Sequence, residues 1–141
     1  MRFWDSSALV PLLVPEPSSE RLTALMRQDP AAAVWWSAPV ECASAVARLE
    51  REAGMSRDDA ARATNRLSAA ALAWTEVAPT DRVRDQAMRL LRLHTLRAAD
   101  ALQLAAALVL ADFDPKTLPF VTLDARLAAA AEREGFQVVG A

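Results

Sequence analysis

Four acidic residues, spread over the whole chain, stand where their carboxylates could act together. Asp5 follows the apolar stretch "RFW", Asp124 follows "PFVTL", and Glu41 lies in the first turn of a predicted helix after "AVWW". Side chains outside the carboxyl ends of parallel strands gather at one edge of the sheet. Asp100 lies two or three residues into a predicted helix that is apolar around its whole circumference. The spacing therefore predicts that the four acids converge on one rim.

Such a cluster favours a divalent cation, because carboxylates without as many basic partners repel one another. Oxygen ligands, with no cysteine or histidine at hand, favour Mg²⁺ or Mn²⁺ over Zn²⁺. Mg²⁺ keeps several waters, which leaves room for a phosphate oxygen and an attacking hydroxide. The chemistry that these residue types indicate is the hydrolysis of a phosphodiester bond.

Each acid also has a simpler interpretation. Asp5 and Asp124 could be N-caps of the helices that they precede, and Glu41 could complement a helix amino end. Asp100 could pair with Arg97, three residues back on the same helix face. Each simple role is common by itself, but chance convergence of all four acids is much less expected.

Other catalytic classes lack the residues that they need. His94 is the only histidine, which excludes a two-histidine mechanism, and it is predicted to lie at the surface or against a phosphate. The chain has three glycines and neither of the glycine-rich phosphate-binding motifs. Cys42, the only cysteine, is predicted to be a small core residue, so a disulfide within the chain is excluded. Asp112 and Asp114 are typical of a turn.

Composition places the chain among ordinary folded domains. Its 141 residues predict one domain over residues 1–141, with a hydrophobic share of 53% and a charged share of 24%. The net charge of −2 exerts no overall attraction for nucleic acid, so any such binding needs a local patch. The single cysteine, and the lack of a leader or a membrane-spanning stretch in this sequence, predict a cytoplasmic protein with no membrane contact.

One local patch stands out in "DRVRDQAMRLLRLHTLR". We give it two interpretations: a solvated helix face, or a surface that contacts the phosphates of a nucleic acid. Its basic residues are Arg82, Arg84, Arg89, Arg92 and Arg97, against only two acids, Asp81 and Asp85.

The elements that must position these residues alternate along the chain. Short apolar strands are predicted at 2–5, 32–36, 75–79, 118–124 and 136–140. Helices are predicted at 6–14, 15–28, 38–54, 56–74, 80–94, 95–112 and 125–135, with Ser6 or Ser7, Ser56 and Thr80 as caps. Apolar strands separated by helices predict an α/β protein, a three-layer α/β/α sandwich with a central, mainly parallel sheet.

Four segments carry a resemblance to a known family: "FWDSSALVPLL", "SAPVECASAVAR", "LRAADALQLAAAL" and "FVTLDARLAAAAEREGFQVV". In order, spacing and neighbours they resemble the PIN domain family, and within it the VapC-like ribonuclease toxins of type II toxin–antitoxin systems. The resemblance covers nearly the whole chain. Ala99 departs from it, since many relatives have an aromatic residue there.

The resemblance implies that Asp5, Glu41, Asp100 and Asp124 form the acidic metal site. It also implies that Ser6 and Thr122 are partners of those carboxylates. The expected activity is a Mg²⁺- or Mn²⁺-dependent endoribonuclease that works as a homodimer. The expected partner is a cognate antitoxin whose C-terminal segment occupies the groove of the site.

The expected mechanism is metal-assisted in-line hydrolysis of RNA. Asp5, Asp100 and Asp124 would be ligands or outer anchors, and Glu41 would orient the water or bind a second metal. Two alternatives remain: a non-catalytic PIN-like interaction module, and an aspartate phosphoacceptor domain, although the latter usually needs a nearby lysine. Trp35 and Trp36 could belong to the core, to a dimer interface or to a partner contact.

Overall fold

The computed structural model describes residues 1–140, and Ala141, the last residue of the predicted domain, lies outside the described residues. Its sheet is built from β1 (Arg2–Trp4), β2 (Ala32–Trp35), β3 (Thr75–Val77), β4 (Phe120–Val121) and β5 (Val138–Val139). The strand order is β3-β2-β1-β4-β5, and every neighbouring pair is parallel. The parallel sheet predicted from the alternating elements is confirmed.

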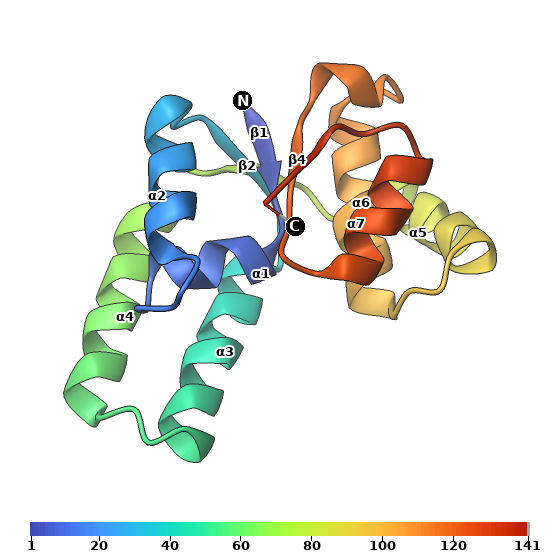
Figure 1. Cartoon of the computed structure of the whole chain (residues 1–141). Coiled ribbons are helices and arrows are strands. Elements are labelled where there is room, and N and C mark those ends of the chain that lie inside the picture. The colour runs from blue at the N-terminus through green and yellow to red at the C-terminus, as the bar shows by residue number, and fades with distance from the viewer. Residues whose placement is uncertain (141) are drawn as a thin grey trace.

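The helices cover both faces of this sheet (Figure 1). They are α1 (Ser6–Leu9), α2 (Ser19–Gln28), α3 (Ala38–Glu52), α4 (Arg57–Ala71), α5 (Asp81–Leu93), α6 (Ala98–Leu110) and α7 (Ala125–Arg133), with short 3-10 turns at η1 (Val10–Leu12) and η2 (Pro115–Thr117). Among residues 1–140, no helix combines the length and the apolar character needed to cross a membrane.

Alternation along the strands divides the core into two layers. Phe3 points into one layer, where Phe120 and Leu104 also lie, and its neighbour Trp4 points into the other, with Leu22 and Cys42. Successive side chains of a strand face opposite sides of the sheet, so each central strand contributes to both layers. The three-layer α/β/α sandwich is therefore confirmed. The part of the core around Phe3 lies between the sheet and α5, α6 and α7, and the part around Trp4 lies between the sheet and α1 to α4.

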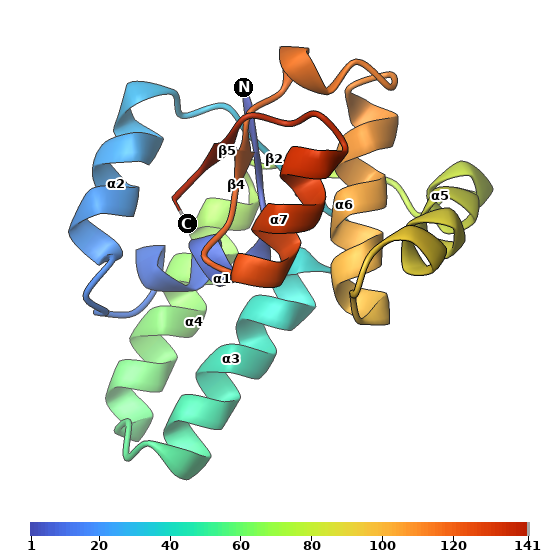
Figure 2. The ribbon, with the colours of Figure 1, turned by 45° about the vertical axis from the view of Figure 1, so that its right-hand side comes forward.

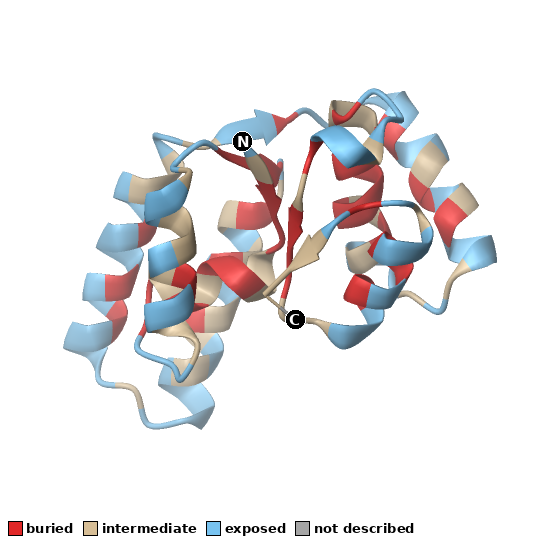
Figure 3. Ribbon diagram, turned by 45° about the horizontal axis from the view of Figure 1, so that its top comes forward, coloured by how far each residue is buried: buried red, intermediate tan, exposed pale blue. Residues whose placement is uncertain are grey.

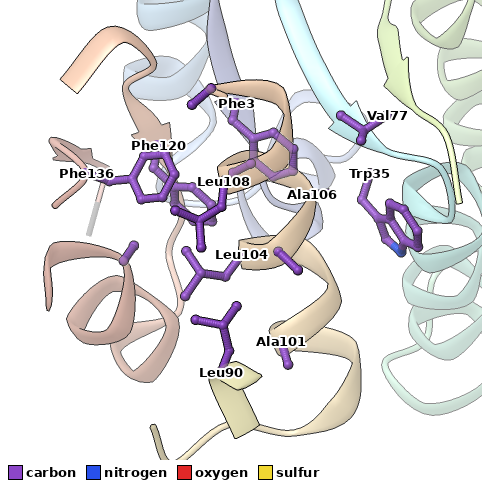
Figure 4. Close-up of a cluster of buried hydrophobic side chains, with 14 of the residues drawn as sticks. Phe3, Trp35, Val77, Leu90, Ala101, Leu104, Ala106, Leu108, Phe120 and Phe136 are labelled. Carbon is purple, nitrogen blue, oxygen red and sulfur yellow. The ribbon is translucent and has the colours of Figure 1, made fainter. Parts of the chain in front are cut away.

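The apolar helix α6 is the centre of the first layer. Ala101, Leu104 and Leu108 are buried among strand residues and the neighbouring helix α5 (Figure 4). Its first turn differs, because Ala99 is exposed and Asp100 is only half-buried. The expectation of an aspartate inside a buried helix is wrong at this point. The amino end of α6 lies at the rim, and burial begins one residue later, at Ala101. Figure 3 shows that buried residues concentrate on the central strands and on the helix faces toward them, while the outward helix faces are exposed.

Local signals account for most of the helix ends. The side chains of Ser56 and Thr80 accept hydrogen bonds from the backbone of α4 and α5, as expected for N-caps. At α1, however, the cap is Asp5, and neither Ser6 nor Ser7 takes that role. Both serines begin the helix, which leaves their hydroxyls free to contact carboxylates.

Candidate functional site

All four predicted acids lie at the carboxyl edge of the sheet. Asp5 directly follows β1, and Asp124 caps α7 just after β4. Glu41 lies in the first turn of α3, and Asp100 lies in the first turn of α6. Figure 2 shows α1 and the beginnings of α3, α6 and α7 gathered below the sheet. The acids come from four segments that are far apart in the sequence.

Asp5 is buried and held by several donors. One carboxylate oxygen, Oδ2, accepts hydrogen bonds from the Ser7 backbone N–H, from the Ser7 hydroxyl and from Thr122 Oγ1, the last at 2.9 Å. Burial raises the pKa of Asp5, the hydrogen bonds from Ser7 and Thr122 oppose that rise, and the nearby charge of Glu41 adds to it. The donors therefore offset part of the cost of burying this carboxylate.

Glu41 is also surrounded by donors. Its Oε2 accepts from Ser6 Oγ at 2.6 Å and from Gln103 Nε2 at 2.7 Å, and its Oε1 accepts from Ser37 Oγ at 2.8 Å. Ser6 Oγ also lies 3.4 Å from Asp5 Oδ1. One serine hydroxyl thus joins the two carboxylates. The expected partner Ser6 contacts both acids.

Thr122 contacts a carboxylate, as the resemblance implied, and does more besides. Its fully buried hydroxyl donates to Asp5 and accepts the backbone N–H of Asp124 at 3.0 Å. Thr122 therefore connects the end of β4, the cap of α7 and the acid that follows β1.

Three contact residues were missed by the sequence analysis: Ser7, Ser37 and Gln103. Gln103 is almost fully buried, and its second amide atom, Oε1, is buried without a hydrogen-bond partner. A polar residue inside the apolar helix was a visible signal, because a buried amide needs a partner. The partner itself, Glu41, is 62 positions away and could be found only in the folded chain.

Asp100 and Asp124 are less constrained. Asp124 Oδ1 accepts the Leu127 backbone N–H at 2.8 Å as the cap of α7. Asp100 forms no ion pair within residues 1–140, so pairing with Arg97 is not its role here. Burial raises the pKa of Asp100, the charges of Asp124 and Glu41 raise it further, and Arg97 opposes the rise. This carboxylate therefore feels the repulsion that a cation would relieve.

Two open grooves meet at Ala99 and Asp100. One, of about 530 Å³, lies between α6 and α7 and is lined by Arg97, Ala99, Asp100, Asp124, Ala125 and Arg126. The other, of about 460 Å³, lies between α1, α3 and α6, with Ser6, Val40, Glu41 and Arg48 among its lining. The acidic rim is therefore open to a ligand from two sides.

The residues fit a divalent cation in their chemistry, although not as a finished cage. In residues 1–140, no three His, Cys, Asp or Glu side chains are grouped closely enough to hold a metal as they stand. The acids offer only oxygen donors, and the mutual repulsion at Asp100 favours a cation. Mg²⁺ suits such a site, because it retains water and takes only one or two protein carboxylates.

The arginine run does not form a single free surface. Arg84 pairs with Asp81, and Arg82 lies 3.7 Å from Asp112 and over the ring of Phe113. Asp112 and Phe113 both have a positive φ, as suits the predicted turn.

Arg89, from the same run, is bound to Glu134 at the end of α7. His94 binds the other oxygen of Glu134 at 2.9 Å and is nearly buried, with 7% of its side chain exposed. The prediction of His94 at the surface or on a phosphate is therefore wrong, because the end of α7 covers it. Burial would raise the pKa of Glu134, but Arg89 and His94 hold it below its usual value.

Three further residues are now placed. Cys42 is buried, as predicted, and burial together with the charges of Glu41 and Asp5 raises its pKa to about 12, so the thiol stays protonated. Trp35 belongs to the core. Trp36, next to it, is 54% exposed.

Comparisons with known proteins show the fold. No protein-family model matches the sequence, and no curated protein matches it. A solved structure described as a toxin-antitoxin complex from Klebsiella pneumoniae contains a similar chain, with a TM-score of 0.66 and 16% identity over 99% of this chain and 96% of that one. A second, the crystal structure of FitAcB from Neisseria gonorrhoeae, has a TM-score of 0.69 and 18% identity over 99% and 97%. Because both identities are below 20%, these comparisons show the fold alone, which is the α/β/α sandwich described above.

Proposed function

We propose that this protein is a metal-dependent endoribonuclease that hydrolyses RNA phosphodiester bonds at its acidic rim. The observation that carries the proposal is the meeting of four carboxylates from four distant segments, where burial and the charges of Asp124 and Glu41 raise the pKa of Asp100. A protein that kept these acids for helix capping alone would gain nothing from placing them beside one another.

In this proposal Asp100 and Asp124 hold the cation directly, because Asp100 has no ion-pair partner and Asp124 uses only one of its oxygens as a cap. When bound, Mg²⁺ or Mn²⁺ would lower the pKa of an attacking water and stabilise the negative charge that develops on the phosphate. Asp5 adds negative charge from its buried position. The serine and glutamine donors keep the Glu41 carboxylate in one orientation, in which it positions the attacking water.

We further propose that the protein is the cytoplasmic toxin of a toxin–antitoxin pair, that it forms a homodimer, and that an antitoxin segment occupies its groove. The sequence resemblance supports this, as does the similar chain in the Klebsiella toxin-antitoxin complex. Light scattering of the purified chain would test the dimer. Co-purification with the product of a neighbouring small gene would test the antitoxin.

The test of the activity is cleavage of RNA by the purified protein, with structured RNAs as substrates. We expect cleavage with Mg²⁺ or Mn²⁺, none in EDTA and none when Ca²⁺ replaces the metal, because Mg²⁺ chemistry requires strict geometry. Asp100→Asn serves as the matched inactive control. Cleavage that persists in EDTA would overturn the mechanism.

The two alternatives make different predictions. A non-catalytic module would bind RNA or a protein and show no cleavage under any metal. A phosphoacceptor would need a lysine at the site, but Lys116, the only lysine, lies in η2 just before β4. In a parallel sheet that position is the amino edge, opposite the acids. The nuclease is therefore the function that this geometry supports best.

A further inference from the structure

Two arginines stand out because they line the groove that contains both Asp100 and Asp124. Arg48, which also forms no ion pair within the described residues, lines the other groove. Arg97 immediately precedes α6, and Arg126 is the second residue of α7. Both are exposed, and both line the groove of about 530 Å³ that contains Asp100 and Asp124. Within residues 1–140 neither forms an ion pair, in contrast to Arg82, Arg84 and Arg89 of the arginine run.

We propose that Arg97 and Arg126 form the phosphate-binding site for the RNA strand beside the bond to be cleaved. The proposal rests on the proposed function, and it names the part of the substrate that this groove takes. A guanidinium group binds phosphate oxygens through two parallel hydrogen bonds, which suits it to a nucleic-acid backbone. Arg97 is the N-cap residue of α6 and Arg126 lies in the first turn of α7, so two separate elements bring a guanidinium group to the same groove.

The charges of the groove would suit a phosphate ligand once its carboxylates hold a cation. Two arginines and two carboxylates line the groove, so the formal charges of its side chains sum to zero. A neutral groove does not attract a polyanion by itself, but the arginines flank the acids and offer separate positive points. A divalent cation between the carboxylates would give the whole groove a positive charge. RNA binding is therefore expected to strengthen when Ca²⁺ is added, even though cleavage is not.

The other arginines provide the contrast. Arg89 is bound to Glu134, and Arg82 and Arg84 each have an acidic neighbour. Arg92 is exposed on α5, like Arg97 and Arg126, but it does not line the groove. It is therefore a matched control, with the same side chain and a similar exposure at a different place.

The experiment measures the binding of a short, fluorescein-labelled single-stranded RNA by anisotropy at several salt concentrations. Ca²⁺ replaces Mg²⁺, so that no RNA is cleaved. For single strands each phosphate contact contributes about 0.7 to the slope of log K against log salt. We expect Arg97→Gln and Arg126→Gln each to reduce the slope by about 0.7, and the double variant by about 1.4. Arg92→Gln should leave the slope unchanged.

Several outcomes would overturn the proposal: unchanged slopes in both groove variants, an equal loss in Arg92→Gln, or no RNA binding by the parent protein. All three arginines are exposed, so we expect the variants to melt at the same temperature as the parent. Equal midpoints would exclude loss of the fold as the cause of a changed slope. Failure of the nuclease proposal is a separate result. If the parent protein binds RNA through Arg97 and Arg126 but never cleaves it, the phosphate-binding site stands and the proposed activity is refuted. If the parent protein cleaves RNA but the slopes of both groove variants are unchanged, the activity stands and the phosphate-binding site is refuted.

Discussion

The two halves of the acidic rim differ in how their carboxylates are held. Asp5 and Glu41, which we call the bonded pair, accept hydrogen bonds from serine, threonine and glutamine side chains. Asp100 and Asp124, the open pair, border a groove, and within residues 1–140 they accept hydrogen bonds from backbone N–H groups, Asp124 from Leu127 and Asp100 from Arg97, but from no side chain. Both pairs belong to one site, but side-chain donors occupy the oxygens of the bonded pair, of which Glu41 also lines the second groove.

The difference teaches how one cluster of acids can serve both structure and chemistry. The bonded pair joins α1, α3, α6 and the end of β4 through its donors, so its charges belong to the framework. In the open pair, Asp100 has no side-chain donor, and burial and then the charges of Asp124 and Glu41 raise its pKa. A fixed framework beside unsatisfied charge is the arrangement that preorganised catalysis needs.

The largest expected effect is on activity when the open pair loses a charge. Asp100→Asn should reduce cleavage by roughly 10²–10³-fold or more, because a carboxylate that would hold the cation is lost, and with it the charge stabilisation that the cation would supply. In EDTA its thermal midpoint should equal or exceed that of the parent, since repulsion among the acids falls. A buried pair with Arg97 would instead cost roughly 3–5 kcal/mol. Cleavage assays and melting curves in EDTA are the measurements. A large drop in the thermal midpoint of Asp100→Asn would show that Asp100 is not an open carboxylate but half of a buried ion pair.

The bonded pair should respond in the opposite way, through stability. Asp5→Ala removes the cap of α1 and leaves the buried hydroxyl of Thr122 without its acceptor. We expect a loss of about 2–4 kcal/mol in the free energy of unfolding. Asp100→Ala, as the matched variant, should change it by less than about 1 kcal/mol. Urea unfolding in EDTA gives both values, and similar losses would erase the distinction between the pairs.

Gln103 tests whether the orientation of Glu41 matters to the open pair. Gln103→Met has a similar shape but no donor, and it also removes the unpartnered Oε1. We expect Mn²⁺ affinity to fall by roughly 10–100-fold, as for other outer partners of metal sites. Stability without metal should change little, because Ser6 and Ser37 still bind Glu41. Electron paramagnetic resonance of Mn²⁺ measures the affinity, with Leu102→Met as control, and an unchanged affinity would make Gln103 merely structural.

The smallest effect is the dependence of stability on pH. The folded chain raises the pKa of Asp100 above 3.8, so its ionised form destabilises the fold at neutral pH. As the pH falls through the raised pKa towards 3.8, protonation of Asp100 removes this cost from the parent. Asp100→Asn has no carboxylate there, so it has no such cost at any pH. The advantage of the variant in EDTA should therefore shrink and disappear on acidification. Melting curves across this range check it, and a constant gap would assign the advantage to another cause.

Much of the fold could be predicted because its signals are local. Alternating short strands and helices indicated the parallel sheet, and Ser56 and Thr80 marked helix starts by capping. His94 shows where such reasoning fails. It lies in an arginine-rich segment, so it was expected at the surface or on a phosphate, yet Glu134 at the end of α7 covers it. A contact over 40 positions leaves no trace in the local pattern.

For the site, the sequence by itself determined which acids meet, because each stands at the carboxyl end of a strand or in the first turn of a helix, and parallel strands bring such positions to one edge. It did not determine what each acid does there. Only the tertiary structure decided that side-chain donors hold Asp5 and Glu41, while Asp100 and Asp124 have no side-chain donor within residues 1–140. Their donors, Thr122, Gln103 and the serines, lie up to 117 positions away. Hydrogen bonding depends on distances of a few tenths of an ångström, which spacing along a chain does not specify.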